Sequence, residues 1–231
     1  TTAGLSLPLA STTYAEDLGI ALINTAPGAI LDGGSVVAVQ SARRYAVDAA
    51  AVGSTVTIGS PEGPNGKLYI AGKVRAYSAI NLNSGISSDG KDIDLDATGV
   101  LETVDGNIEF SAGENGVLQG DVIARGAGRD VLLSSDRSLT IEGLIQANDR
   151  IILTGGDGTY ISDSSVSGYR SLDIKNTAKI TTLDAHGGVR LTGTNQVYID
   201  GEIETTRSDH DVSINSDLGD VMLNETSGRI T

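Results

Sequence analysis

A seven-residue phrase recurs along the chain and constrains the fold more than any other sequence feature. It reads apolar, any residue, Gly, any residue, Ile or Val, any residue, Ala or Thr. Four strong copies lie at residues 70–76, 118–124, 141–147 and 199–205, and a weaker copy lies at residues 104–110. Such repetition is typical of solenoids, in which each unit buries its apolar face only by stacking on its neighbours.

Pairs of apolar residues separated by a single residue accompany most copies of the phrase. They are Ile20/Leu22, Val37/Val39, Val56/Ile58, Ile80/Leu82, Ile93/Leu95, Ile108/Phe110, Val131/Leu133, Ile151/Leu153, Leu172/Ile174, Val189/Leu191 and Val212/Ile214. Alternation with a period of two indicates short strands with one buried face. From Ile20 to Val212 the pairs cover 192 residues in ten intervals, a mean of 19.2.

These spacings predict an all-β fold, a parallel β-helix with coils of about 19–20 residues. About 11 coils would occupy residues 19–231, and residues 1–18 are expected to form an irregular N-terminal cap or linker. The alternative fold is a β-sandwich, which needs longer strands joined by hairpin turns such as Asn115-Gly116.

Composition limits the core and the partners. The chain has 231 residues, of which 39% are hydrophobic, with one Phe, one Met, no Trp and no Cys. The core must therefore consist of Val, Ile, Leu and Ala, and neither disulfides nor Cys-based zinc sites are available. The net charge of -14 argues against a nucleic-acid partner, and no apolar stretch is long enough to span a membrane.

A 19-residue unit, residues 187–205, resembles the haemagglutinin repeat of filamentous haemagglutinin-like adhesins of the two-partner secretion type. Similar repeats occur in giant bacterial surface proteins, and the resemblance extends over about residues 55–231. It implies a right-handed β-helix at the bacterial cell surface or outside the cell. The Asn-Pro-Asn signature of that family's secretion domain is absent, so the resemblance implies an internal piece of the shaft.

Four arginines form the one candidate ligand surface. Arg129, Arg150, Arg170 and Arg190 recur at intervals of 21, 20 and 20 residues, and equal phase on a solenoid means vertical stacking. Such a column could form a groove for anionic glycans. The alternative is an ion-pair ladder with Asp130, Asp149 and Asp173, since unpaired stacked arginines repel one another.

Three carboxylates in residues 92–96, Asp92, Asp94 and Asp96, begin like a calcium loop. Ala97 and Thr103 stand where an EF-hand needs Gly and Glu, so the pattern predicts a strand with three solvated carboxylates instead. No catalytic residue, cofactor or metal site is predicted.

The sequence thus favours a structural shaft segment of a secreted or cell-surface fibre or adhesin, and not an enzyme. Residues 220–230 follow the coil pattern without a cap. Expected partners are more of the same polypeptide or like subunits at the coil ends, and cell-surface glycans.

Two alternatives remain open. The first is a polysaccharide-binding or polysaccharide-cleaving β-helix of the lyase or tailspike type, which for hydrolysis needs two carboxylates about 5–10 Å apart. The second is a passive ice- or cation-binding face, which needs a threonine column that Thr55-Val-Thr57 does not continue.

Overall fold

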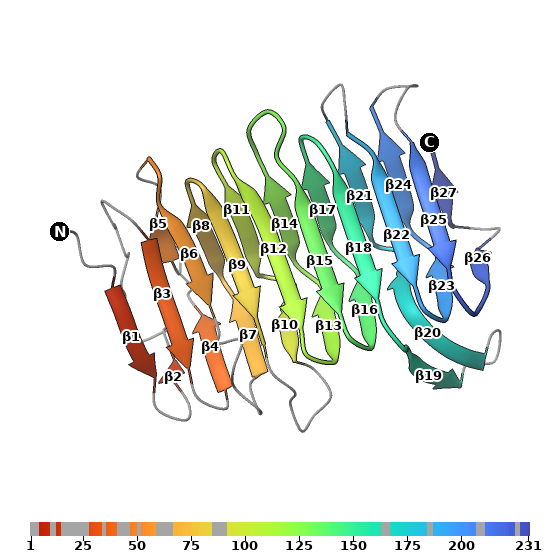
Figure 1. The fold of residues 1–231 in the computed structure, drawn as a ribbon, viewed down its shortest axis with the longest axis horizontal. Coiled ribbons are helices and arrows are strands. Elements are labelled where there is room, and N and C mark those ends of the chain that lie inside the picture. The colour runs from red at the N-terminus through yellow and green to blue at the C-terminus, as the bar shows by residue number, and fades with distance from the viewer. Residues whose placement is uncertain are drawn as a thin grey trace.

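The structure is a computed structural model. It describes residues 5–9, 13–14, 28–33, 36–40, 47–49, 52–58, 67–84, 92–162, 167–183, 187–206, 211–224 and 227–231. These residues contain no helix, and their strands form three parallel sheets that stack as a β-solenoid (Figure 1). The predicted all-β parallel β-helix is confirmed.

Each regular coil contributes one strand to each sheet. Sheet A contains β1 (Leu5–Leu9), β3 (Gly28–Gly33), β6 (Thr55–Ile58), β9 (Ala79–Asn83), β12 (Asn107–Ala112), β15 (Val131–Ser135), β18 (Ile151–Gly155), β22 (Val189–Gly193) and β25 (Val212–Ser216).

Sheet B contains β2 (Thr13–Tyr14), β4 (Val36–Gln40), β7 (Lys67–Ala71), β10 (Ile93–Leu95), β13 (Asn115–Leu118), β16 (Ser138–Ile141), β20 (Ser167–Ile174), β23 (Gln196–Ile199) and β26 (Val221–Leu223). Sheet C contains β5 (Val47–Ala49), β8 (Lys73–Ala76), β11 (Val100–Thr103), β14 (Asp121–Ala124), β17 (Leu144–Ala147), β21 (Lys179–Thr182), β24 (Glu202–Thr205) and β27 (Arg229–Ile230).

The core is a continuous column of aliphatic side chains enclosed by the three sheets. Alternate residues of the strands from β6 to β24 point inward, and nearly all of these are Val, Ile, Leu or Ala with almost no exposed surface. The single Phe fits because its neighbour is glycine: a Cβ at Gly116 would lie 2.7 Å from the Phe110 ring. The composition of the core therefore agrees with the sequence-based prediction.

The predicted coil length of 19–20 residues is wrong. Parallel partners Val56 and Ile80 differ by 24 residues, and Ile108 and Val131 differ by 23. The coils are about 24 residues long, and those from β6 to β24 make about six turns, not the 11 predicted for the whole chain. The apolar pairs gave too short a spacing because they mixed two sheets: Ile93/Leu95 and Leu172/Ile174 lie in sheet B, most others in sheet A.

The recurring phrase is the corner between sheets B and C. In three of the four strong copies the first apolar residue ends a strand of sheet B, and in the first copy β7 ends one residue later, at Ala71. In all four the Gly forms the corner, and the rest is a strand of sheet C. The weaker copy at residues 104–110 follows β11 and enters β12, so it is the corner from sheet C to sheet A. The phrase thus marks one corner of a coil and not a whole coil, and the corners between β10 and β11 and between β20 and β21 lack it.

Glycines at this corner allow the coils to approach closely. A Cβ on Gly120 would lie 2.1 Å from the carbonyl oxygen of Gly99, and a Cβ on Gly143 would lie 2.1 Å from that of Gly120. Real Cβ atoms do not approach so closely, so the backbone of the neighbouring coil excludes a side chain. Ala178 takes the equivalent position in a later coil, since Lys179 pairs with Leu144.

Residues 1–18, predicted as an irregular cap or linker, contain strands β1 and β2, which pair in parallel with β3 and β4 and so continue sheets A and B.

One coil is interrupted by a long excursion. The coil between Ile151 and its partner Val189 is 38 residues long, because β19 (Thr159–Ser162) and the start of β20 form an antiparallel hairpin. The hairpin extends along the lower edge of the solenoid (Figure 1).

The corner glycines generate a stability prediction. We expect Gly143→Ala to lower the free energy of unfolding by about 1–3 kcal/mol, because the methyl group must displace the backbone of the preceding coil. Chemical denaturation measures the change. The matched control is Ala178→Gly, which removes a methyl group from the one coil that accommodates it. An unchanged midpoint for Gly143→Ala would contradict the close-approach argument.

Candidate functional site

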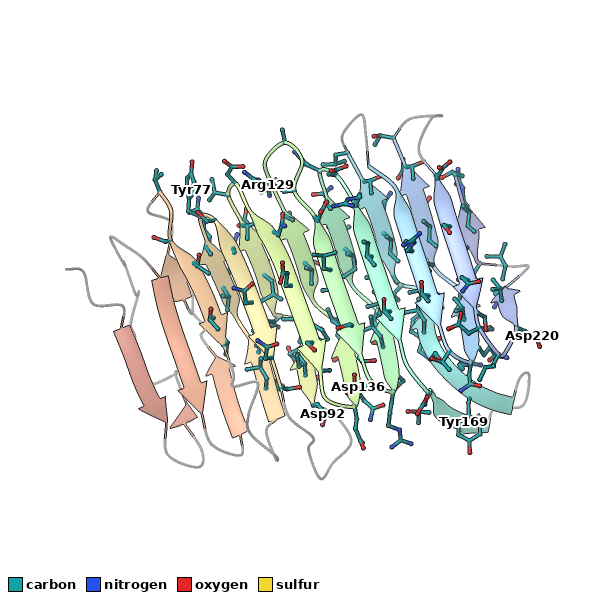
Figure 2. The ribbon with its side chains drawn as sticks, in the orientation of Figure 1. Tyr77, Asp92, Arg129, Asp136, Tyr169 and Asp220 are labelled. Atoms are coloured by element: carbon teal, nitrogen blue, oxygen red, sulfur yellow. The ribbon has the colours of Figure 1, made fainter. Side chains whose placement is uncertain are left out.

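The four arginines expected to form a column lie on different parts of the coil. Arg129 lies at the corner that leads into sheet A (Figure 2), Arg150 immediately precedes β18, Arg170 lies in β20 of sheet B, and Arg190 lies in β22 of sheet A. In the sheet register Arg190 lies beside Ile152, not beside Arg150. The coils here differ in length, 20 residues from Val131 to its partner Ile151 and 38 from Ile151 to its partner Val189, so equal spacing in sequence does not produce vertical stacking.

Three of these arginines are paired with carboxylates. Arg129 Nε donates to Asp105 Oδ1 at 2.9 Å, and Arg150 Nη2 donates to Asp130 Oδ2 at 2.7 Å. The hydrogen bond to Asp130 and its negative charge raise the pKa of Arg150 further above its ordinary value. The contact between Arg150 and Asp130 is one that the ion-pair alternative to a ligand groove predicted, whereas Asp105 was not among the predicted partners. Both contacts join residues of successive coils, so they add to the stacking of the coils.

The three carboxylates of residues 92–96 do not form the solvated face predicted from the sequence. Asp92 is fully buried, and its Oδ2 accepts the backbone N–H groups of Glu114 and Asn115 at 2.6 Å each. Asp94 is also buried. Only Asp96 is partly exposed, and hydrogen bonds from the backbone and hydroxyl of Thr98 lower its pKa. Asp92 therefore satisfies the backbone of the next coil at the corner between sheets A and B (Figure 2).

Sheet C carries ion pairs that join neighbouring strands on its outer face. Glu102 of β11 contacts Lys73 of β8 and lies 2.7 Å from Nε of Arg125. Burial alone would raise the pKa of Glu102, but the hydrogen bonds and positive charges of Lys73 and Arg125 outweigh it, so the pKa lies below 4.5. Further along, Lys179 pairs with Glu202 and Glu204. These charges neutralise one another locally.

A buried polar cluster lies where the hairpin joins sheet B. Arg170 is 4% exposed, and its Nη1 donates to Asp173 Oδ2 at 3.1 Å. Lys175 Nζ donates to the same oxygen at 2.8 Å, and the Arg170 guanidinium lies over the Tyr198 ring, 4.1 Å from its centroid. Arg170 is the third arginine of the predicted column, and it pairs with Asp173 as the ion-pair alternative expected.

The cluster is incompletely satisfied. Arg170 Nε, Asp173 Oδ1 and Gln196 Oε1 are buried and have no hydrogen-bond partner. Tyr169, adjacent to the cluster, points away from the solenoid and is half exposed (Figure 2). Insertions into a solenoid coil often mark its binding face, so the hairpin and this cluster are the most distinctive polar feature of the described residues.

The outer face of sheet A carries two regular columns of side chains. The central column consists of Asn81, Glu109, Leu132, Ile152, Arg190 and Ser213 on six successive strands. The hydroxyl column beside it consists of Asn83, Ser111, Ser134, Thr154, Thr192 and Asn215. Members of both columns line a shallow hollow of about 290 Å³. The central column therefore combines charged and apolar side chains, while the column beside it carries only small polar ones.

Neither a metal centre nor a membrane span is found in the part of the chain that the structure describes. No group of three or more His, Asp or Glu side chains could hold a metal ion there, and no helix could cross a bilayer. A scan against protein-family models, a search of curated proteins and a search of solved structures each gave no match. The solenoid architecture rests on the three parallel ladders of the described residues.

Sequence reasoning missed the two columns of sheet A and the buried cluster. The columns follow from the coil register, which the mixed pair spacing hid. The cluster depends on a hairpin that the repeat pattern does not encode. One sequence signal was available: the Gly-rich stretch at residues 155–158 is typical of an excursion from a regular strand.

The buried ion pair makes a prediction about stability. Asp173→Ala leaves the buried Arg170 without its carboxylate, and we expect it to lower the free energy of unfolding by about 3–5 kcal/mol. Asp136→Ala, at an exposed corner (Figure 2), is the matched control and should change it by less than about 0.5 kcal/mol. Equal denaturation midpoints for the two variants would show that Asp173 does not support Arg170.

The lowered pKa of Glu102 predicts a pH dependence. A carboxylate whose folded pKa lies below its unfolded value stabilises the fold fully above that unfolded value, here near 4.5, and loses the contribution as pH falls through the folded pKa. We expect the stability difference between the wild-type chain and Glu102→Gln to be constant at neutral pH and to shrink below pH 4.5. Denaturation curves across that range measure it. A difference that grows on acidification would contradict the assignment.

Proposed function

We propose that this chain is a structural shaft segment of a secreted or cell-surface bacterial fibre or adhesin, with no catalytic role. The observation that carries the proposal is the uninterrupted aliphatic core from β6 to β24, closed by three parallel ladders. Such a construction gives a rod whose length grows by about 4.8 Å per coil and whose contacts are all with neighbouring coils. The haemagglutinin-type repeat pattern supports the same role.

The last described coil supports joining at the ends. Val221, Leu223 and Ile230 occupy inward positions in β26 and β27, yet they are 46%, 48% and 40% exposed. Their counterparts one coil earlier, such as Ile199 and Ile203, are fully buried. A further coil of the same kind, from the same polypeptide or a like subunit, would cover these side chains and extend the three ladders.

The polysaccharide alternative has weaker support. Among the residues that line the hollow on sheet A, Glu109 is the only carboxylate. Hydrolysis of a glycan needs two carboxylates on opposite sides of the bond. The aromatic side chain of that hollow, Phe110, points into the core and offers no face to a sugar. The shaft role therefore agrees better with the described surface.

End-to-end joining gives the test of this proposal. At high protein concentration we expect the wild-type chain to form elongated assemblies, visible by electron microscopy and as a concentration-dependent sedimentation coefficient. Leu223→Lys places a charge on the uncovered core and should abolish them. Leu218→Lys, at a residue of the same coil that is 79% exposed in a bend, is the matched control and should assemble normally. Elongated assemblies that persist in Leu223→Lys would count against end-to-end joining.

A further inference from the structure

The central column of sheet A carries a pattern of charge that is complementary to itself when its order is reversed. Glu109, Leu132, Ile152 and Arg190 lie in register on the consecutive strands β12, β15, β18 and β22. Glu109 and Arg190 are exposed, and neither side chain has a hydrogen bond or ion pair with another described residue. Most other charged side chains on the coils are paired, as Arg129 and Arg150 are. Two unpaired opposite charges thus flank two half-buried apolar side chains.

We propose that this face of sheet A docks onto the same face of a second copy of the chain, with the two solenoids antiparallel. A twofold axis that runs along the strands, midway between Leu132 and Ile152, reverses the order of the column. It places Glu109 opposite the second copy's Arg190 and Leu132 opposite the second copy's Ile152. An isologous interface requires such self-complementarity, and the pattern acid, apolar, apolar, base provides it.

The same twofold rotation also brings compatible residues together in the columns on either side of the central one. In the hydroxyl column, Ser134 comes to lie opposite the second copy's Thr154, and both side chains are small enough for sheets to pack about 10 Å apart. At the strand starts, Asp130 comes to lie opposite the second copy's Arg150. A parallel alignment would instead place Glu109 against Glu109 and Arg190 against Arg190, so the charges select the antiparallel arrangement.

The dimensions of the face predict a weak association for a single chain. Six strands about 4.8 Å apart, each about five residues long, give about 400 Å² per copy. A standard interface buries about 800 Å² per partner, so one such face holds two chains only transiently. Rods that extend toward one another from two facing surfaces run antiparallel, and they would present many faces at once and gain from their effective concentration. The interaction surface therefore fits lateral bundling of fibres.

A second copy explains the face better than a glycan does. The hydroxyl column could donate and accept hydrogen bonds with sugar hydroxyls, but a glycan gives no reason for a mirrored pattern of Glu, two apolar residues and Arg. The net charge of -14 opposes contact between copies. At about 0.15 M salt the Debye length is about 8 Å, so this general repulsion is screened while direct Glu–Arg contacts persist.

A charge-reversal cycle tests the proposal. All chains carry Leu223→Lys, which removes end-to-end joining. Any association that remains then reports on lateral docking alone, so the two proposals are tested separately. Sedimentation equilibrium at high concentration should detect a dimer. Glu109→Arg and Arg190→Glu should each weaken it by about tenfold or more, because each creates two like-charge contacts per dimer. The double variant Glu109→Arg/Arg190→Glu should restore it, and Arg137→Glu, an equal charge change outside sheet A, should leave the dimer intact.

Cysteine cross-linking tests the orientation, because the chain has no cysteine of its own. A mixture of Glu109→Cys and Arg190→Cys chains should form a disulfide-linked heterodimer, whereas neither variant alone should cross-link efficiently. The proposal is overturned if the Leu223→Lys chain is monomeric at all concentrations, if the double reversal fails to restore the dimer, or if Glu109→Cys alone cross-links best. Binding of a neutral oligosaccharide to a Leu223→Lys chain that stays monomeric would overturn the proposal in favour of glycan binding.

Discussion

Every coil of this solenoid depends on the backbone hydrogen bonds that it makes with the coils on either side. An isolated coil has no partner within itself for the N–H and C=O groups of its strands, and its aliphatic side chains would remain in water. Stacking solves both problems, since the three ladders pair the backbone while the inward side chains of the three sheets close over the core. The close approach of Gly120 and Gly143 at the corner, and the capture of backbone N–H groups by Asp92, follow from the same need for an unbroken register.

Charge is arranged around this register. A chain of net charge -14 would repel itself if its acids were free, and many of them are held against cations from an adjacent coil, as Glu102 is against Lys73 and Arg125. Each exposed ion pair of this kind contributes little to the free energy of folding. The pairs nevertheless join side chains of neighbouring coils and so act in the same direction as the backbone hydrogen bonds. Against that background the unpaired Glu109 and Arg190 on sheet A, and the half-satisfied Arg170 cluster beneath the hairpin, stand apart as polar features that stacking alone does not require.

The repeat phrase predicted the architecture correctly because it records two local requirements of the fold, a tight glycine corner and a short alternating strand, that recur in most of the described coils. The coil length could not be read in the same way. Ile93/Leu95 and Val131/Leu133 look alike in sequence, since a strand of sheet B and a strand of sheet A bury the same kind of pair. The prediction of an arginine column was wrong for this reason. The prediction that Asp92 is solvated was wrong because the backbone groups that bind its carboxylate lie 22 and 23 residues away in the sequence. Contacts across a coil become predictable only once the register is known.

The 38-residue coil has a mechanical consequence. If the chain is pulled from one end, the coils can unfold one at a time from that end, because each coil contacts only its neighbours. A regular coil of about 24 residues shortens the rod by about 4.8 Å and releases about 80 Å of extended chain. The coil that contains the β19–β20 hairpin holds more length, about 130 Å. The hairpin therefore stores extra chain length at one position in the rod. When a force unfolds the coils in turn, this coil would release more extended chain than any other described coil.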